Sequence, residues 1–133
     1  MEPTEVEIAR KLARALDQED YESARSWMED DCVYEIRGET IVGADKIIAS
    51  YRENAEAGRD RFDSVCFESS VSSIGDGRVR IDYTDIVTRS GDTLIHRCAQ
   101  LVEFGESDQA CRIVHEDLEG EREALEAFKA SHP

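Results

Sequence analysis

The sequence has no long apolar run and few basic residues. No stretch of its 133 residues approaches the roughly 20 consecutive apolar residues of a membrane-spanning helix. Sixteen Lys and Arg side chains stand against 31 Asp and Glu side chains, which leaves a formal net charge of -15. Because this charge repels phosphate backbones, we expect neither a membrane nor a nucleic acid as a partner.

The sequence also lacks the compact motifs of several enzyme classes. It contains no Gly-rich phosphate loop, no GxSxG elbow and no HExxH helix, and none of its four cysteines forms a CxxC pair. Met1 is followed by the acidic segment EPTEVE rather than by a basic and apolar segment, so we expect no signal peptide. These absences favour a cytoplasmic protein with reduced thiols, no cofactor and no metal.

Helical periodicity dominates the first half of the chain. Apolar residues at positions 8, 12, 15 and 16 form one stripe and predict a first helix over residues 4–17. Asp20 caps a second, short helix that we expect to run to Met28 and to place Trp27 on its inner face. After the strand candidate DCVYEIRG, helical spacing over residues 47–55 predicts a third helix that ends at Gly58.

The period changes to two residues from Phe62 onward. Glycine-bearing breaks at residues 75–77, 90–92 and 105–109 separate four strand-like runs, which predicts an antiparallel meander. The segment EGEREALEAFKAS then predicts a short C-terminal helix. With no linker or repeat in view, residues 1–133 are expected to form a single α+β domain in which N-terminal helices pack on one face of an antiparallel sheet.

One strand of this meander carries an acid on its apolar face. The run VRIDYTDIV places Asp85 where the alternation calls for a fourth apolar residue. A two-residue turn at Ser90-Gly91 would set Asp85 directly opposite His96, with Tyr83 opposite Cys98 and Ile81 opposite Gln100. A turn at Gly91-Asp92 would instead oppose Asp85 with Cys98 and leave His96 two residues along.

The inward face of the last strand depends on the loop at residues 105–109. A four-residue loop turns Ile113, His115 and Asp117 toward the face of Asp85, and a five-residue loop turns Val114, Glu116 and Leu118 there. We favour the first, which would bring Asp117 across from His96. Under it, His96 and His115 with Asp117 or Asp85 are the one candidate set of metal ligands, although no tight motif supports them.

The order of elements around DDCVYEIRG, VGADKIIASYREN and RIVHEDLEGEREALEAF resembles the nuclear transport factor 2-like superfamily. Within it, the chain is most similar to the SnoaL-like polyketide cyclases and the relatives of ketosteroid isomerase. The resemblance implies a cystatin-like cone with a curved sheet around a pocket for a small apolar molecule. It also implies a homodimer joined through the outer sheet face, where Ile86, Ile95 and Leu101 lie.

The resemblance directs attention to one set of residues in this pocket. It suggests Asp85 and His96 as catalytic residues, with Tyr83 or Tyr34 as a hydrogen-bond donor, as in the ketosteroid isomerase mechanism that serves as a standard example. The expected pocket wall is formed by Trp27, Tyr34, Tyr51, Tyr83, Cys98, Gln100, His115 and Asp117. The leading hypothesis is therefore a SnoaL-like small-molecule-binding protein, with isomerase, cyclase or dehydratase chemistry as its enzymatic form.

Three alternatives stay open at this point. Asp85 is a structural residue if it forms a hydrogen-bonded pair with His96 or a tyrosine, because buried polar atoms need partners whatever their purpose. The chain is a non-catalytic binding or dimerisation module if its own side chains fill the pocket. Cys98, close to His96, is a nucleophile if its thiol ionises.

Overall fold

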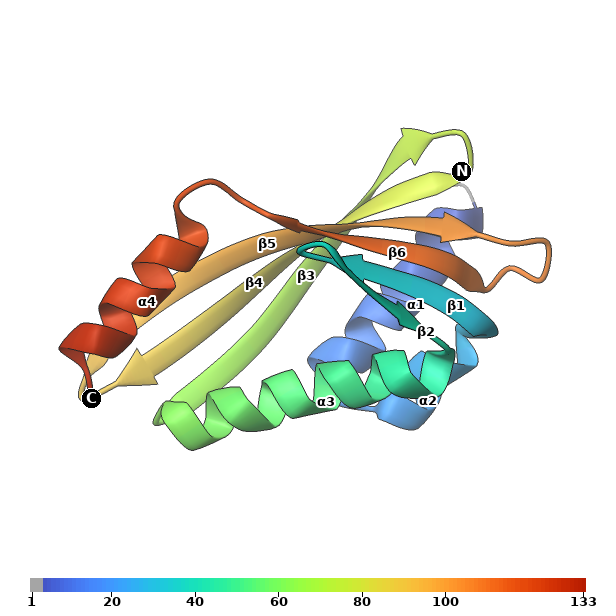
Figure 1. Cartoon of the computed structure of the whole chain (residues 1–133). Helices are drawn as coiled ribbons and strands as arrows, with labels where there is room; N and C mark the ends of the chain where they lie inside the picture. Colours follow the sequence, from blue (N-terminus) through green and yellow to red (C-terminus); the bar gives the residue numbers. More distant parts are fainter. Residues whose placement is uncertain (1–3) are drawn as a thin grey trace.

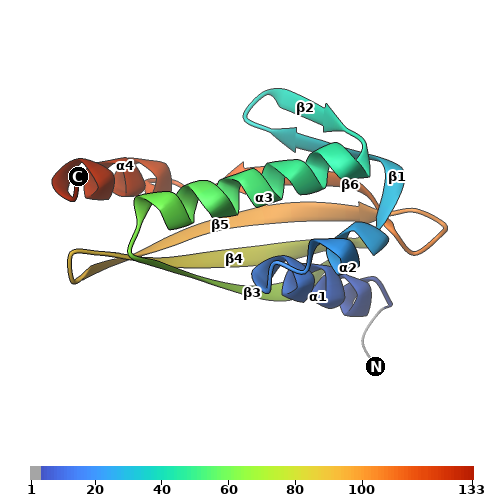
Figure 2. The ribbon, with the colours of Figure 1, turned by 90° about the horizontal axis from the view of Figure 1, so that it is seen from below.

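A curved six-stranded sheet with three helices on one face forms the body of the molecule (Figures 1 and 2). The computed structural model describes residues 4–133. The helices are α1 (Thr4–Asp17), α2 (Tyr21–Ser26), α3 (Ala44–Arg61) and α4 (Glu121–Ser131). The strands are β1 (Met28–Ile36), β2 (Glu39–Val42), β3 (Ser64–Gly75), β4 (Arg78–Arg89), β5 (Asp92–Phe104) and β6 (Ala110–Asp117).

The sheet confirms the predicted meander and adds two features to it. Strands β3 to β6 pair as antiparallel neighbours, in the sheet order β2-β1-β6-β5-β4-β3. The pairing of β1 with β6 is parallel, so the sheet is mixed rather than wholly antiparallel. Strand β2, which was not predicted, forms a hairpin with β1 at the edge. The β1–β6 pairing depends on tertiary packing, because local alternation does not specify which distant strand lies alongside. The β1–β2 hairpin is local: Arg37 and Gly38, with φ of 46° and 80°, form its two-residue turn.

The turn between β4 and β5 has the predicted position. Ser90 and Gly91 both have positive φ, at 54° and 83°, which is the geometry of the two-residue turn that matches strand twist. Arg89 consequently pairs with Asp92, and Asp85 pairs with His96. The alternative turn at Gly91-Asp92 is thereby excluded.

Two helix ends differ from the prediction. Helix α2 stops at Ser26, and Met28 already belongs to β1, where its fully buried side chain packs in the core. Helix α3 continues through Gly58 to Arg61, and Gly58 is an ordinary helical residue. The continuation is explained by packing, since Phe62 after the helix is buried and Arg61 donates to the backbone carbonyls of Lys129 and His132.

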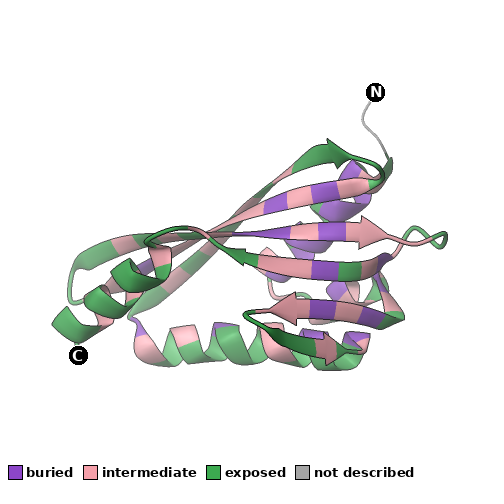
Figure 3. Cartoon of the chain, turned by 45° about the horizontal axis from the view of Figure 1, so that its top comes forward, coloured by how far each residue is buried: buried purple, intermediate pink, exposed green. Residues whose placement is uncertain are grey.

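The hydrophobic core lies at one end of the sheet, where α1, α2 and the first half of α3 cover it (Figure 3). The stripe predicted for α1 is buried there, including Leu12 at 1% exposure. Helix α4 lies at the other end against β5 and contains no fully buried residue (Figure 1). The sheet therefore has a filled end and an end at which space remains between it and the helices.

Two further expectations can be compared with the structure. No helix within residues 4–133 is long and apolar enough to cross a membrane. All four cysteines are free thiols.

Truncation of the core should destabilise the fold far more than truncation of an exposed position of the same type. Ile81 is fully buried, and Ile74 is 40% exposed. We expect Ile81→Ala to lower the free energy of unfolding by about 2–5 kcal/mol, because it leaves a cavity. Ile74→Ala should change it by less than about 0.5 kcal/mol. Urea unfolding checks both, and equal losses would contradict the assignment of the core.

Candidate functional site

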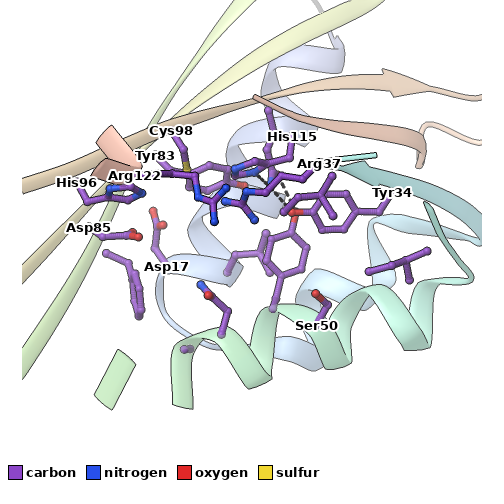
Figure 4. Close-up of a pocket in the computed structure, with 18 of the residues that line it drawn as sticks. Asp17, Tyr34, Arg37, Ser50, Tyr83, Asp85, His96, Cys98, His115 and Arg122 are labelled. Carbon is purple, nitrogen blue, oxygen red and sulfur yellow. Dashed lines mark hydrogen bonds between the residues drawn. The ribbon is translucent and has the colours of Figure 1, made fainter. Parts of the chain in front are cut away.

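A cavity of about 580 Å³ opens between the inner face of the sheet, α3 and α4 (Figure 4). Seven of the predicted pocket and catalytic residues on the strands line it: Tyr34, Tyr83, Asp85, His96, Cys98, Gln100 and His115. Tyr51 of α3 also lines it, and its ring stacks on that of Tyr34 with centroids 5.6 Å apart. The chain's own side chains therefore leave the cone open, contrary to the filled-pocket alternative.

Asp85 and His96 face each other across β4 and β5 at the wall of this cavity. No hydrogen bond within the described residues reaches the Asp85 carboxyl group. Burial raises the pKa of Asp85 to about 6, against a smaller lowering by His96. The hydrogen-bonded structural pair considered from the sequence is thus not formed, and the carboxyl group is left to titrate near neutral pH.

Two further polar atoms beside Asp85 lack partners. The Tyr83 hydroxyl and the His96 Nδ1 atom are buried without a hydrogen bond to any described residue. Glu121 is the nearest acid to His96, but its Oε2 lies 3.9 Å from Nδ1, beyond hydrogen-bond distance. Since buried polar groups in native proteins are usually paired, two unpaired atoms beside Asp85 distinguish this part of the cavity wall from an ordinary core.

Asp17, at the end of α1, adds a second carboxyl group to this part of the cavity. Burial raises its pKa, while a hydrogen bond from the Ser69 hydroxyl opposes the rise. In Figure 4 the carboxyl groups of Asp17 and Asp85 point into the same space. Each carboxylate disfavours ionisation of the Tyr83 hydroxyl, whose pKa is raised mainly by burial.

On the opposite wall of the cavity, the side chains form a hydrogen-bond network centred on Gln100. Tyr51 donates its hydroxyl proton to Gln100 Oε1 at 2.6 Å, and Gln100 Nε2 contacts the Tyr34 hydroxyl at 3.1 Å and His115 Nδ1 at 3.3 Å. His115 Nδ1 accordingly accepts, and its Nε2 donates to Asp117 at 3.0 Å. Burial lowers the pKa of His115, in keeping with this neutral form. Tyr34 accepts from Gln100, so its own proton is free for a ligand.

Strand β6 turns the predicted side chains inward, but the residue opposite Asp117 on β5 is not the predicted one. Ile113, His115 and Asp117 face the side of Asp85, as predicted. The predicted reason is wrong, because the loop has five residues, 105–109, and the bulge beside Phe104 turns these side chains inward. Asp117 pairs with Cys98 rather than lying across from His96, because a bulge near Glu103 shifts the register. Its carboxylate binds Arg37 through two bonds of 2.7 and 2.8 Å, and outside the cavity lining it acts as a support for His115.

One other sequence expectation is wrong, and one open alternative is disfavoured. Trp27 does not line the cavity: it ends α2, packs against the core and has the Lys11 amine 5.3 Å above its ring. The shortened helix α2 explains this placement. Cys98 lines the cavity, but burial raises its pKa to about 12, so a thiolate nucleophile is disfavoured at neutral pH.

Several lining residues escaped the sequence analysis, among them Asp17, Arg37 and Arg122. Each lies at the end of a helix or strand or just beyond it, where the spacing of apolar residues does not indicate which way a side chain points. The proposed metal set of His96 and His115 with an acid is also not assembled. Within residues 4–133, no group of three or more His, Cys, Asp and Glu side chains is arranged to hold a metal ion.

Comparisons with solved structures identify the fold. A protein assigned as a polyketide cyclase from Xanthomonas campestris pv. campestris matches with a TM-score of 0.70 and 13% identity, over 96% of this chain and 95% of its own. TerC, crystallised with polyporic acid, matches with a TM-score of 0.71 and 15% identity, over 96% and 99%. A nuclear transport factor 2-like protein of unknown function from Exiguobacterium sp. 255-15 matches with a TM-score of 0.64 and 8% identity, over 84% and 98%.

The chain thus has the α+β cone fold of nuclear transport factor 2-like proteins, as its sequence predicted. At these identities the likeness concerns the fold alone. Neither the comparison with protein-family models nor that with curated proteins finds a match. Function must therefore be argued from the cavity.

The raised pKa of Asp85 should cost stability at high pH. Because its folded-state pKa exceeds the unfolded value, the contribution of the protonated form is fully present below pH 3.8 and is lost as the pH rises through about 6. Asp85→Asn stays neutral, so it should gain stability over the wild type at pH 8 relative to pH 4. At about 1.4 kcal/mol per pKa unit, discounted for partial exposure, the gain is roughly 1–2 kcal/mol.

Urea unfolding of both proteins at the two pH values measures this gain. Asp60→Asn, at an exposed position of α3, is the matched control and should show no such dependence. A stability difference between Asp85→Asn and the wild type that is the same at both pH values would contradict the burial of the carboxyl group.

Proposed function

We propose that the chain binds a small, largely apolar molecule in the cavity and acts on it by acid–base catalysis, as an isomerase, cyclase or dehydratase. The observation that carries the proposal is the unpaired Asp85 carboxyl group on the cavity wall, with a pKa raised to about 6. A general base works best when its pKa lies near the operating pH. An acid with a purely structural role would be paired instead.

In the proposed step, the Asp85 carboxylate takes a proton from a carbon next to a carbonyl group. The C–H electron pair becomes the second bond of an enolate, and the carbonyl π pair moves onto oxygen. The free protons of the Tyr83 and Tyr34 hydroxyls are donors for this oxygen. Protonated Asp85 then returns the proton to the same or another carbon as the carbonyl π bond re-forms, and His96 lies beside it on the cavity wall.

The remaining lining supports an apolar substrate. The stacked rings of Tyr34 and Tyr51, together with Leu16, Ile36 and Ile41, make one wall of the cavity. A volume of about 580 Å³ falls within the range of small-molecule sites. That TerC was crystallised with polyporic acid supports the use of this fold for small molecules of such size.

Proton abstraction can be tested without knowing the natural substrate. We expect the wild-type protein to accelerate deuterium exchange at the carbons flanking the carbonyl of 2-tetralone in D2O, measured by proton NMR. Asp85→Asn should lower the exchange rate by about 100-fold or more, since it removes the general base. The rate should rise as the pH increases through about 6, where Asp85 ionises, and level off above.

Asp60→Asn, which is remote from the cavity, should exchange 2-tetralone at the wild-type rate. Equal rates for the wild type and Asp85→Asn, or no acceleration by the wild type, would count against acid–base catalysis. The non-catalytic binding function would then be preferred.

We also infer a cytoplasmic homodimer joined through the outer sheet face. The four free thiols support the location. Ile95, 43% exposed and paired with the half-buried Ile86, supports the interface, with the half-buried Leu101 further along the same strand. Sedimentation velocity should give about twice the 15.0 kDa of one chain. Ile95→Lys should yield monomers, whereas Ile74→Lys, at a position of similar exposure, should not. A monomeric wild type would contradict the interface.

A further inference from the structure

Most arginines of this acidic chain have a partner. Six of them bind carboxylates: Arg25, Arg37, Arg59, Arg80, Arg89 and Arg112. Arg52 lies over the Tyr21 ring, and Arg61 donates to backbone carbonyls. Among the described residues, Arg14, Arg78, Arg97 and Arg122 have no hydrogen bond, ion pair or ring contact, and of these four only Arg122 lines the cavity.

Arg122 belongs to α4 and lines the cavity. No hydrogen bond or ion pair with a described residue engages its guanidinium group. Figure 4 shows the Arg122 side chain among the residues that line the cavity, and Arg122 is exposed to solvent. Arg37, the other arginine of the lining, is neutralised by Asp117. Arg122 therefore presents the one uncompensated guanidinium among the described residues of the cavity wall.

We propose that Arg122 binds a carboxylate of the ligand, so that the natural substrate is a small apolar carboxylic acid. The planar guanidinium fork matches a carboxylate through two parallel hydrogen bonds. The inference rests on the proposed function, because it assigns the substrate class of the same cavity. With its carboxylate held by α4, the ligand lays its apolar body against the rings of Tyr34 and Tyr51 and within reach of Asp85.

The acids of the cavity are compatible with an anionic ligand. The lining contains three acids, Asp17, Glu39 and Asp85. Burial raises the pKa of Asp17, which eases its protonation when an anion enters, while Asp85 stays ionised as the base and the ligand carboxylate is held away from it at Arg122. A cationic amine would suit these acids and the aromatic rings. It would, however, face the unpaired charge of Arg122, and for this reason we favour the carboxylate.

Side-chain bonds anchor helix α4 mainly at its C-terminal end. Its C-terminal end is fixed by bonds from Arg61 to the carbonyls of Lys129 and His132, and by the 2.7 Å contact between His132 and Asp92. Its N-terminal end follows Gly120, which has a φ of 81° and provides no side-chain cap. The guanidinium is thus carried by the less constrained end of the helix.

Three probes of the same shape test the inference: 2-naphthoate, its neutral amide 2-naphthamide, and the cation of 2-(aminomethyl)naphthalene. By calorimetry at pH 7, the wild type should bind 2-naphthoate at least about tenfold more tightly than 2-naphthamide, as a charge-assisted pair requires. Arg122→Gln should lose this preference while binding 2-naphthamide as before. Arg122→Lys, which keeps the charge without the fork, should be intermediate. Arg14→Gln, exposed on α1, is the matched control and should behave like the wild type.

Several results would overturn the inference. These are equal affinity of the wild type for acid and amide, a preference for the acid that survives in Arg122→Gln, tightest binding of the amine, or binding of no probe. The outcome is separable from that of the proposed function. Exchange of 2-tetralone that depends on Asp85, without a preference for the acid, would refute only the role of Arg122. A preference for the acid without exchange would refute only the catalysis.

Discussion

The register between β4 and β5 is the constraint on which the site depends. The turn at Ser90 and Gly91 fixes it, and a shift by one residue would send every inward side chain of β5 to the opposite face. In the observed register, Asp85 lies opposite His96, and Cys98 and Gln100 follow on the same face. The core depends on it too, because Val79 and Val102 form a fully buried pair in the same ladder.

The polar groups around the cavity form two sets, one hydrogen-bonded to other side chains and one without such partners among the described residues. Gln100 and its neighbours Tyr51, Tyr34 and His115 form a network that rigidifies one wall. Asp85, the Tyr83 hydroxyl, His96 Nδ1 and Arg122 lack hydrogen-bond partners among the described residues. Arg122 is exposed and solvated, but the buried Tyr83 hydroxyl and His96 Nδ1 cost stability when unpaired. Proteins concentrate such groups at functional sites, where a ligand completes their bonding. This contrast, rather than the fold, is the argument for a function in this cavity.

The sequence predicted the structure best where the alternation of apolar residues and the residues of a tight turn determine it locally. Asp85 stood out because it interrupts an alternation, and Ser90-Gly91 is a recognisable hairpin turn, so their pairing partners followed directly. The inward face of β6 was predicted correctly but for the wrong reason, because the loop has five residues and a bulge that the sequence did not reveal sets the register. Trp27, by contrast, was misplaced because an early strand start at Met28 turned it away from the cavity. Asp17 and Arg122 sit near helix termini, and their direction depends on how α1 and α4 dock, which local pattern does not specify.

The proposed catalysis depends on the ionisation of the Asp85 carboxyl group inside the cone. Its most direct test is a carbon-13 NMR titration of the Asp85 carboxyl resonance, assigned by its loss in Asp85→Asn. Burial beside His96 predicts a midpoint of about pH 6. A midpoint near the ordinary value of 3.8 would mean that water solvates the group freely, and would contradict its role as a base poised near neutral pH.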